Sequence, residues 1–105
     1  MRTAVIKRFE EAKALLRKTM PVARRILGEN NEFTLGMRRN YAQSLYKDAS
    51  ATLDDLRESV TTFEEIERIA RRVLGGAHPL TKVIERDLRR ARDALRARET
   101  QPRGA

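Results

Sequence analysis

The only histidine of the chain, His78, lies immediately before Pro79 and after a pair of glycines. Histidine is a common general acid or base because its pKa lies close to neutral pH, but catalysis also requires an orienting partner and a reacting group within hydrogen-bond reach. Proline favours the first position of a helix, so the residue that precedes it is typical of a helix N-cap. We therefore interpret His78 as a structural cap, name no catalytic residue, and expect that the chain is not an enzyme.

Carboxylate pairs are the next candidates for chemistry. They occur as sequence neighbours at Glu10 and Glu11, Asp54 and Asp55, and Glu64 and Glu65. Neighbouring residues on a helix point about 100° apart, so these carboxylates do not converge as an acid–base dyad. One histidine and no cysteine exclude the common zinc sites, and no glycine-rich phosphate-binding loop occurs. We expect neither a metal nor a cofactor.

The basic side chains support an alternative hypothesis, in which the chain is a basic helical nucleic-acid-binding protein. Lysine and arginine number 23 against 15 acidic residues, a formal net charge of +8. Arginine pairs recur at Arg24–Arg25, Arg38–Arg39, Arg71–Arg72 and Arg89–Arg90. However, acidic residues are interleaved with them, and all three phenylalanines, Phe9, Phe33 and Phe63, fall on apolar stripes rather than among the arginines, which leaves little for base stacking.

The elements that carry these residues are four amphipathic helices. Apolar residues recur every three or four positions over residues 3–27, 32–47, 53–74 and 79–98, and no segment alternates with period two. Asn31, Thr52 and His78 are suitable N-caps, and the short connections make neighbouring helices antiparallel. We predict an all-α fold of stacked hairpins, with one helical-repeat domain over residues 1–99 and a disordered tail over residues 100–105. Pro21 predicts a kink or a break near Thr19.

The apolar stripes predict which side chains are buried. On the first helix they are Val5, Ile6, Phe9, Ala12, Leu15, Leu16, Ala23, Ile26 and Leu27, and on the second Phe33, Met37, Tyr41 and Leu45. On the third they are Leu53, Leu56, Val60, Phe63, Ile66, Ala70, Val73 and Leu74, and on the fourth Leu80, Ile84, Leu88, Ala91 and Leu95.

The chain also repeats itself. Residues 23–28 return as residues 70–75 with one conservative change, 47 positions later, and the same offset carries Asn31 onto His78 and Thr34 onto Thr81. A repeat of 20 to 50 residues in which each unit is a helical hairpin is typical of a solenoid, whose units must stack because one hairpin cannot bury its own apolar face. With one full hairpin and two half-hairpins, the chain is either part of a longer array or forms a homodimer.

The repeated stretches resemble the tetratricopeptide repeats of kinesin light chains. The family signature has an Arg-Arg-x-Leu-Gly turn, then His-Pro-x-Thr-Leu, Asn-Leu-Ala-x-x-Leu-Tyr and a Leu-Glu-Glu-Ala helix. Residues 24–35 and 71–81 match the turn, residues 40–46 match the middle element, and residues 9–12 match the last. The resemblance covers about residues 8 to 98.

The resemblance implies a protein-binding scaffold or adaptor whose concave face, lined by the first helix of each hairpin, holds a peptide or protein partner. It places Asn40 where such repeats often hydrogen-bond a bound peptide backbone. The neighbouring candidates for partner binding are Arg39, Gln43, Tyr46 and Lys47. The equivalent face of the fourth helix carries Arg86, Asp87 and Arg90, of which the two arginines are candidates. Because arginine pairs well with carboxylates, we expect an acidic partner.

The compartment is inferred from what the chain lacks. No apolar run approaches the roughly 20 residues that span a bilayer, and charges at the N-terminus come too early for a signal peptide. The absence of cysteine suits a reducing compartment. We therefore expect a cytoplasmic protein.

Overall fold

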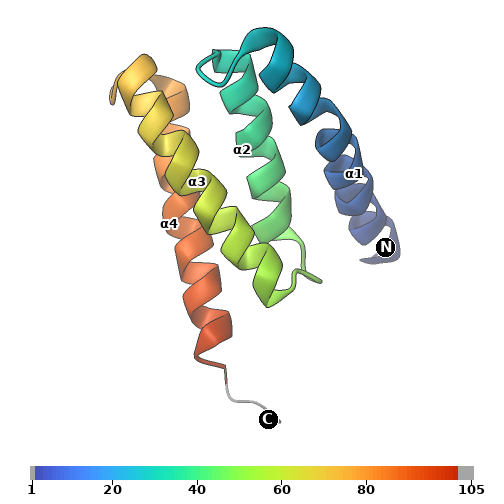
Figure 1. Ribbon diagram of the computed structural model, residues 1–105. Coiled ribbons are helices and arrows are strands. Elements are labelled where there is room, and N and C mark those ends of the chain that lie inside the picture. The colour runs from blue at the N-terminus through green and yellow to red at the C-terminus, as the bar shows by residue number, and fades with distance from the viewer. Residues whose placement is uncertain (1, 102–105) are drawn as a thin grey trace.

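The computed structural model describes residues 2–101 and, within that range, the side chains of residues 7, 8 and 10–101. Its regular structure consists of the helices α1 (Arg2–Leu27), α2 (Glu32–Lys47), α3 (Leu53–Val73) and α4 (Pro79–Glu99), and no strand occurs in these residues (Figure 1). The predicted all-α fold is confirmed, and the helix boundaries agree with the prediction to within one residue. Most of the predicted disordered tail lies outside the described residues.

The helices begin where the predicted caps stand. The side chain of Asn31 accepts a hydrogen bond from the backbone of Phe33, and His78 accepts one from Leu80 in the same way. Thr52 forms a reciprocal capping box with Asp55, which satisfies two backbone donors at once. The role of His78 as a structural cap is confirmed.

Pro21 does not break α1. The helix continues from Arg2 to Leu27, and its ribbon curves along its length (Figure 1). Proline has no N–H to donate to the preceding turn, which bends a helix without requiring it to end. The hydroxyl of Thr19 turns back to the carbonyls of Leu15 and Leu16, at 3.0 and 3.5 Å, on the same stretch.

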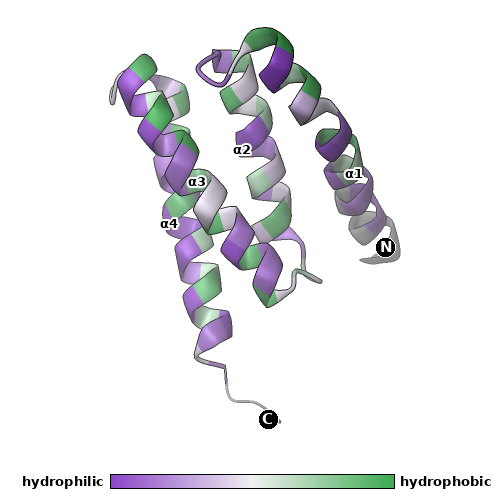
Figure 2. Cartoon of the chain, viewed as in Figure 1, coloured by the Kyte–Doolittle hydropathy of each residue, from purple (hydrophilic) through white to green (hydrophobic). Residues whose placement is uncertain are grey.

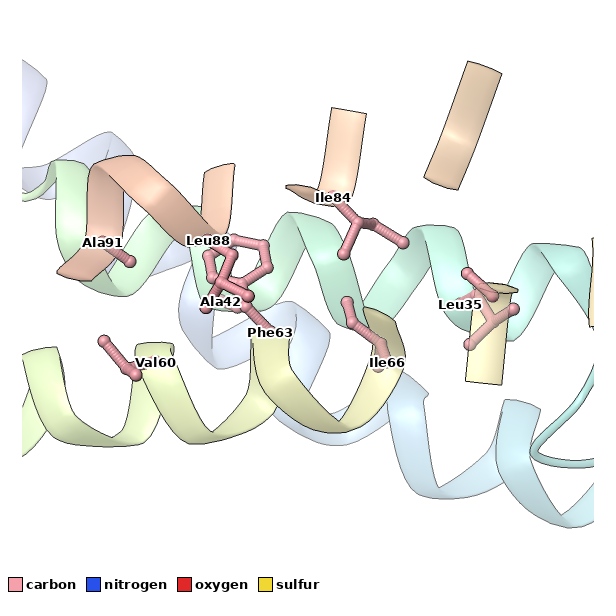
Figure 3. Packing of buried hydrophobic residues seen from close by; sticks show 9 residues of the cluster. Leu35, Ala42, Val60, Phe63, Ile66, Ile84, Leu88 and Ala91 are labelled. Carbon is pink, nitrogen blue, oxygen red and sulfur yellow. The ribbon is translucent and has the colours of Figure 1, made fainter. Parts of the chain in front are cut away.

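The four helices form a stack of antiparallel hairpins with α2 at its centre. Each helix packs against the next, and α2 also touches α4, whereas α1 packs on α2 alone among the described helices (Figure 1). The buried apolar cluster is drawn from α2, α3 and α4 around Phe63 (Figure 3). Its members are Leu35, Ala42, Val60, Phe63, Ile66, Ala70, Ile84, Leu88 and Ala91.

The internal repeat is visible in the backbone as well as in the sequence. Gly28 and Gly75, 47 residues apart, end α1 and α3 with φ values of +88° and +91°. This left-handed conformation is the usual helix terminator, and glycine adopts it without steric cost. Thr34 and Thr81 are both fully buried, each as the third residue of the next helix. The two hairpin turns are therefore built in the same way.

The outer face of α4 is polar where the corresponding face of α2 is apolar. The buried α2 residues Leu35, Ala42 and Leu45 have as their repeat equivalents Lys82, Arg89 and Arg92, all of them exposed. A terminal helix with a polar outer face closes a helical stack. The structure therefore has a closed end at α4.

The prediction of buried stripes is wrong for α1 and for the start of α2. Of the described α1 side chains none is fully buried, because α1 has a neighbour on one side only. The residues predicted as core but exposed are Ala12, Leu15, Ile26 and Leu27 on α1, Phe33 on α2 and Val73 on α3. The side chains of Val5, Ile6 and Phe9 lie outside those described.

Candidate functional site

Two adjoining hollows form an open groove across α2, one toward α1 and the other toward α4. The first, of about 390 Å³, is lined by the last turns of α1 and by Phe33 and Met37. The second, of about 580 Å³, shares Phe33 and Met37 and reaches Asn40 and Leu80. We call the combined feature the α2 groove. Its apolar lining comprises Val22, Ala23, Ile26, Leu27, Phe33, Gly36, Met37 and Leu80.

The floor of the α2 groove is unusually apolar for an open surface. Phe33 is 74% exposed and Ile26 is 70% exposed. The ribbon of α1 is hydrophobic in several places next to the turn that leads into α2 (Figure 2). Exposed apolar patches of this kind on a small domain mark sites where another molecule packs.

Only one of the predicted partner-binding residues, Asn40, lines the groove. It is exposed and lies one turn after Met37 on α2. Its side-chain oxygen lies 3.3 Å from a guanidinium nitrogen of Arg39. The predicted role of Asn40 in binding a partner stays a prediction, and its position is compatible with that role.

Most of the other predicted residues surround one buried carboxylate instead. Asp87 on α4 is fully buried and accepts hydrogen bonds from Nε of Arg39 at 2.7 Å and from the hydroxyl of Tyr46 at 2.8 Å. The ring of Tyr46 also meets Phe63 edge-on, with ring centroids 5.9 Å apart. Arg39 and Tyr46 therefore join α2 to α4 inside the molecule.

The remaining candidates lie around this cluster or in solvent. With its amide oriented to suit its neighbours, Gln43 accepts hydrogen bonds from Arg39 at 2.8 Å and from Lys47 at 3.2 Å. Arg86 and Arg90 are exposed on α4. Arg90 lies close enough to Tyr46 to lower the pKa of its hydroxyl. The structure thus brings Arg39, Gln43, Tyr46, Lys47 and Arg90 together around Asp87, and not around the α2 groove.

The electrostatics of the two tyrosines reflect these internal contacts. Burial and the hydrogen bond to Asp87 raise the pKa of Tyr46 to about 12, against a weaker opposing effect of Arg90. Burial and a 2.7 Å hydrogen bond to Glu58 raise the pKa of Tyr41, and Arg17 opposes them. Both phenols therefore stay protonated at neutral pH and serve as donors inside the fold.

A second buried carboxylate fastens α1 to the rest of the molecule. Asp48, at the end of α2, is buried and lies 3.2 Å from Nζ of Lys13. Burial acts to raise the pKa of Asp48, but hydrogen bonds from Ser50 and the ion pair with Lys13 outweigh it and the pKa is lowered. Arg17 adds a 3.3 Å hydrogen bond to the hydroxyl of Tyr41. The contact between α1 and α2 is thus partly polar.

Within residues 2–101, no three His, Cys, Asp or Glu side chains are grouped so as to hold a metal ion. None of the helices described carries an apolar stretch of the length that a bilayer requires. Comparisons with protein-family models, curated proteins and solved structures gave no match to this chain.

Sequence reasoning missed the groove because it assigned its lining to the core. Periodicity identifies an apolar face but does not say whether a neighbour covers it. One signal was available. The repeat offset pairs α1 and α2 with α3 and α4, and among the described helices none packs over α1 and α2 as α2 packs over α3 and α4.

Proposed function

We propose that this chain is a protein-interaction module of the tetratricopeptide type, a scaffold or adaptor that binds a peptide or protein partner in the α2 groove. The observation that carries the proposal is the apolar lining formed by the exposed Ile26 and Phe33 and the half-buried Met37 on a stack of helical hairpins. An adaptor requires an apolar surface for its partner and does not require a reactive side chain. The role of His78 as the N-cap of α4 agrees with this. Since cysteine is absent, we place its action in a reducing compartment such as the cytoplasm.

The stack supports this function by holding the α2 side of the groove in place from behind. The cluster around Phe63 fixes α2 against α3 and α4, and the Asp87 hydrogen bonds fix the register of α2 and α4. Binding sites that are formed before the partner arrives lose less conformational entropy on association.

The alternative, a basic nucleic-acid-binding protein, is favoured less because several arginines pair with carboxylates of the chain itself. Arg38 pairs with Glu65 at 3.1 Å, Arg39 with Asp87 and Arg92 with Glu64 at 3.0 Å. Among the described side chains, Phe33 is the one exposed aromatic residue, so these residues offer a single surface for base stacking.

Partner capture tests the proposal with matched variants. The immobilised chain, a Phe33→Asp variant and a Val73→Asp variant are incubated with the same cell extract, and bound proteins are quantified by mass spectrometry. Both residues are exposed, so both variants are expected to fold. We expect proteins that the wild type and Val73→Asp retain and Phe33→Asp loses. Equal capture by all three chains would show that the groove is not the binding site.

Salt dependence separates the two functions. Affinity for a fluorescent random-sequence DNA duplex, measured by anisotropy, is expected to be weak and to fall steeply between low and physiological salt, as nonspecific phosphate contacts do. Sub-micromolar DNA binding that survives physiological salt would instead support the nucleic-acid-binding alternative.

A further inference from the structure

The α2 groove is the counterpart of a surface that is covered elsewhere in the same molecule. At the repeat offset of 47 residues, α1 and α2 correspond to α3 and α4. On α3 and α4 the equivalent face is closed because α2 packs over it. The corresponding pairs, groove residue first, are Val22 and Ile69, Ala23 and Ala70, Phe33 and Leu80, and Met37 and Ile84.

What covers the equivalent surface is an α-helix and not an extended chain. The helix α2 lies across α3 and α4 with Leu35 and Ala42 in the apolar cluster and Tyr46 packed against it (Figure 3). The chain itself therefore shows which shape fits a surface of this pattern.

The polar centre of that contact also has its counterpart in the groove. Asn40 corresponds to Asp87, the carboxylate that receives Arg39 and the hydroxyl of Tyr46 from the covering helix. In the groove Asn40 is exposed and neutral. A helix that covers Asn40 therefore does not need an arginine at the position where α2 has Arg39.

The charge around the groove selects the kind of helix. The last turns of α1, which form one wall of the groove, carry the basic residues Lys18, Arg24 and Arg25 and no acidic residue. Lys18 lines the groove itself, and Glu32 of α2 is the acidic residue in the lining. Complementary charge across an interface steers association and excludes like-charged partners. Two copies of this chain joined through their grooves would bring two such walls together, which disfavours a second copy as the occupant.

We propose that the α2 groove receives an amphipathic α-helix of a partner protein, with its apolar face turned to α1 and α2 and acidic residues along its flanks, seated as α2 is seated on α3 and α4. The proposal rests on the proposed interaction function and specifies the partner of the same site. Phe33 and Met37 pack under the apolar face of that helix, as their counterparts Leu80 and Ile84 do under α2, and Ile26 lies at the edge of that face. Asn40 meets a polar side chain at its centre, and Lys18 pairs with an acidic flank.

A synthetic helix tests the proposal directly. The probe is a fluorescent peptide of residues 32–47 with the changes Arg38→Glu, Arg39→Glu and Lys47→Glu, which keeps the apolar face of α2 and reverses its charge. Its binding to the full chain is measured by anisotropy at physiological salt. We expect it to bind at least about tenfold more tightly than the unaltered basic peptide, because the charge of the wall is basic.

Matched variants locate the binding. Ile26→Asp is expected to weaken binding of the acidic peptide by about tenfold or more, because it places a carboxylate in the apolar lining of the groove, close to the acidic flank of the peptide. Val73→Asp changes the equivalent exposed position on α3 and is expected to leave binding unchanged. A second peptide with the further changes Leu35→Asp and Leu45→Asp is expected not to bind. Circular dichroism establishes that both protein variants are folded.

Three outcomes would overturn the proposal. Failure of the acidic peptide to bind, while Phe33→Asp still abolishes partner capture, would keep the interaction function and reject the helical occupant. Equal loss in Ile26→Asp and Val73→Asp would place the peptide outside the groove. A stable dimer in sedimentation equilibrium that Ile26→Asp dissociates would make a second copy the occupant. If neither the peptide nor any captured protein depends on the groove, the proposed function is wrong as well.

Discussion

At the scale of single residues, Asp87 is the side chain on which most of the predicted partner-binding set converges. It joins α4 to α2 through Arg39 and Tyr46, and its own charge is buried. A buried carboxylate is tolerated only where such donors compensate for the loss of water.

Replacing Asp87 by alanine is therefore expected to lower the free energy of unfolding by about 2–4 kcal/mol, because Arg39 and the hydroxyl of Tyr46 lose their acceptor. Urea denaturation measures the loss. The control is Glu64→Ala, which removes an exposed ion pair with Arg92 and should cost less than about 1 kcal/mol. Equal effects of the two changes would mean that the Asp87 cluster contributes no more than a surface pair.

The raised pKa of Tyr46, about 12, predicts a loss of stability in alkaline solution. An unfolded tyrosine ionises near pH 10, so the unfolded chain releases its proton first as the pH rises. The stabilisation is present below about pH 10 and is lost between about pH 10 and 12. Urea midpoints measured across this range should fall, and fall less in Tyr46→Phe. The chain has two tyrosines and no tryptophan, so tyrosinate absorbance reports the ionisation directly.

At the scale of the elements, α1 differs from the other helices. It packs on α2 alone, places no described side chain in the buried cluster, and relies on polar contacts such as Lys13 with Asp48. Segments with few buried apolar contacts open at lower free energy than the core.

Amide hydrogen exchange is expected to show this difference. The α1 amides should exchange faster than those of α3, which is flanked by α2 and α4 and carries Phe63 and Ile66 at the centre of the core. Exchange measured by mass spectrometry on peptic fragments gives the comparison. Protection of α1 equal to that of α3 would mean that the whole stack opens in one cooperative step.

The elements are also where sequence reasoning worked best. Caps are local, so Asn31, Thr52 and His78 could be identified from themselves and the residues that follow. Burial is not local. Tyr46 and Arg39 were read as surface residues because nothing in their own helix reveals Asp87, which lies 41 and 48 residues further along the chain. Phe33 was read as core because its apolar spacing is the same whether or not a neighbour covers it.

At the scale of the whole molecule, two phenylalanines separate the core from the groove. Phe63 is fully buried between α2, α3 and α4, whereas Phe33 stands in solvent. Phe63→Ala is expected to lower the free energy of unfolding by about 3–5 kcal/mol, because it removes a ring and leaves a cavity. Phe33→Ala should change it by less than about 0.5 kcal/mol. Denaturant titration of both variants tests the pair, and a large loss for Phe33→Ala would place that ring in the core.

The two ends of the stack have opposite character, and this limits the size of any complex. One end of the stack carries the apolar α2 groove. At the α4 end the exposed residues Lys82, Arg89 and Arg92 occupy the repeat positions of the buried α2 residues Leu35, Ala42 and Leu45. Rings or filaments would form if the α4 end of one molecule bound the groove of the next. The charged side chains of the α4 end do not fit the apolar groove, so this contact is disfavoured. Bound complexes should therefore stop at one-to-one stoichiometry, and concentrated solutions of the chain should not polymerise.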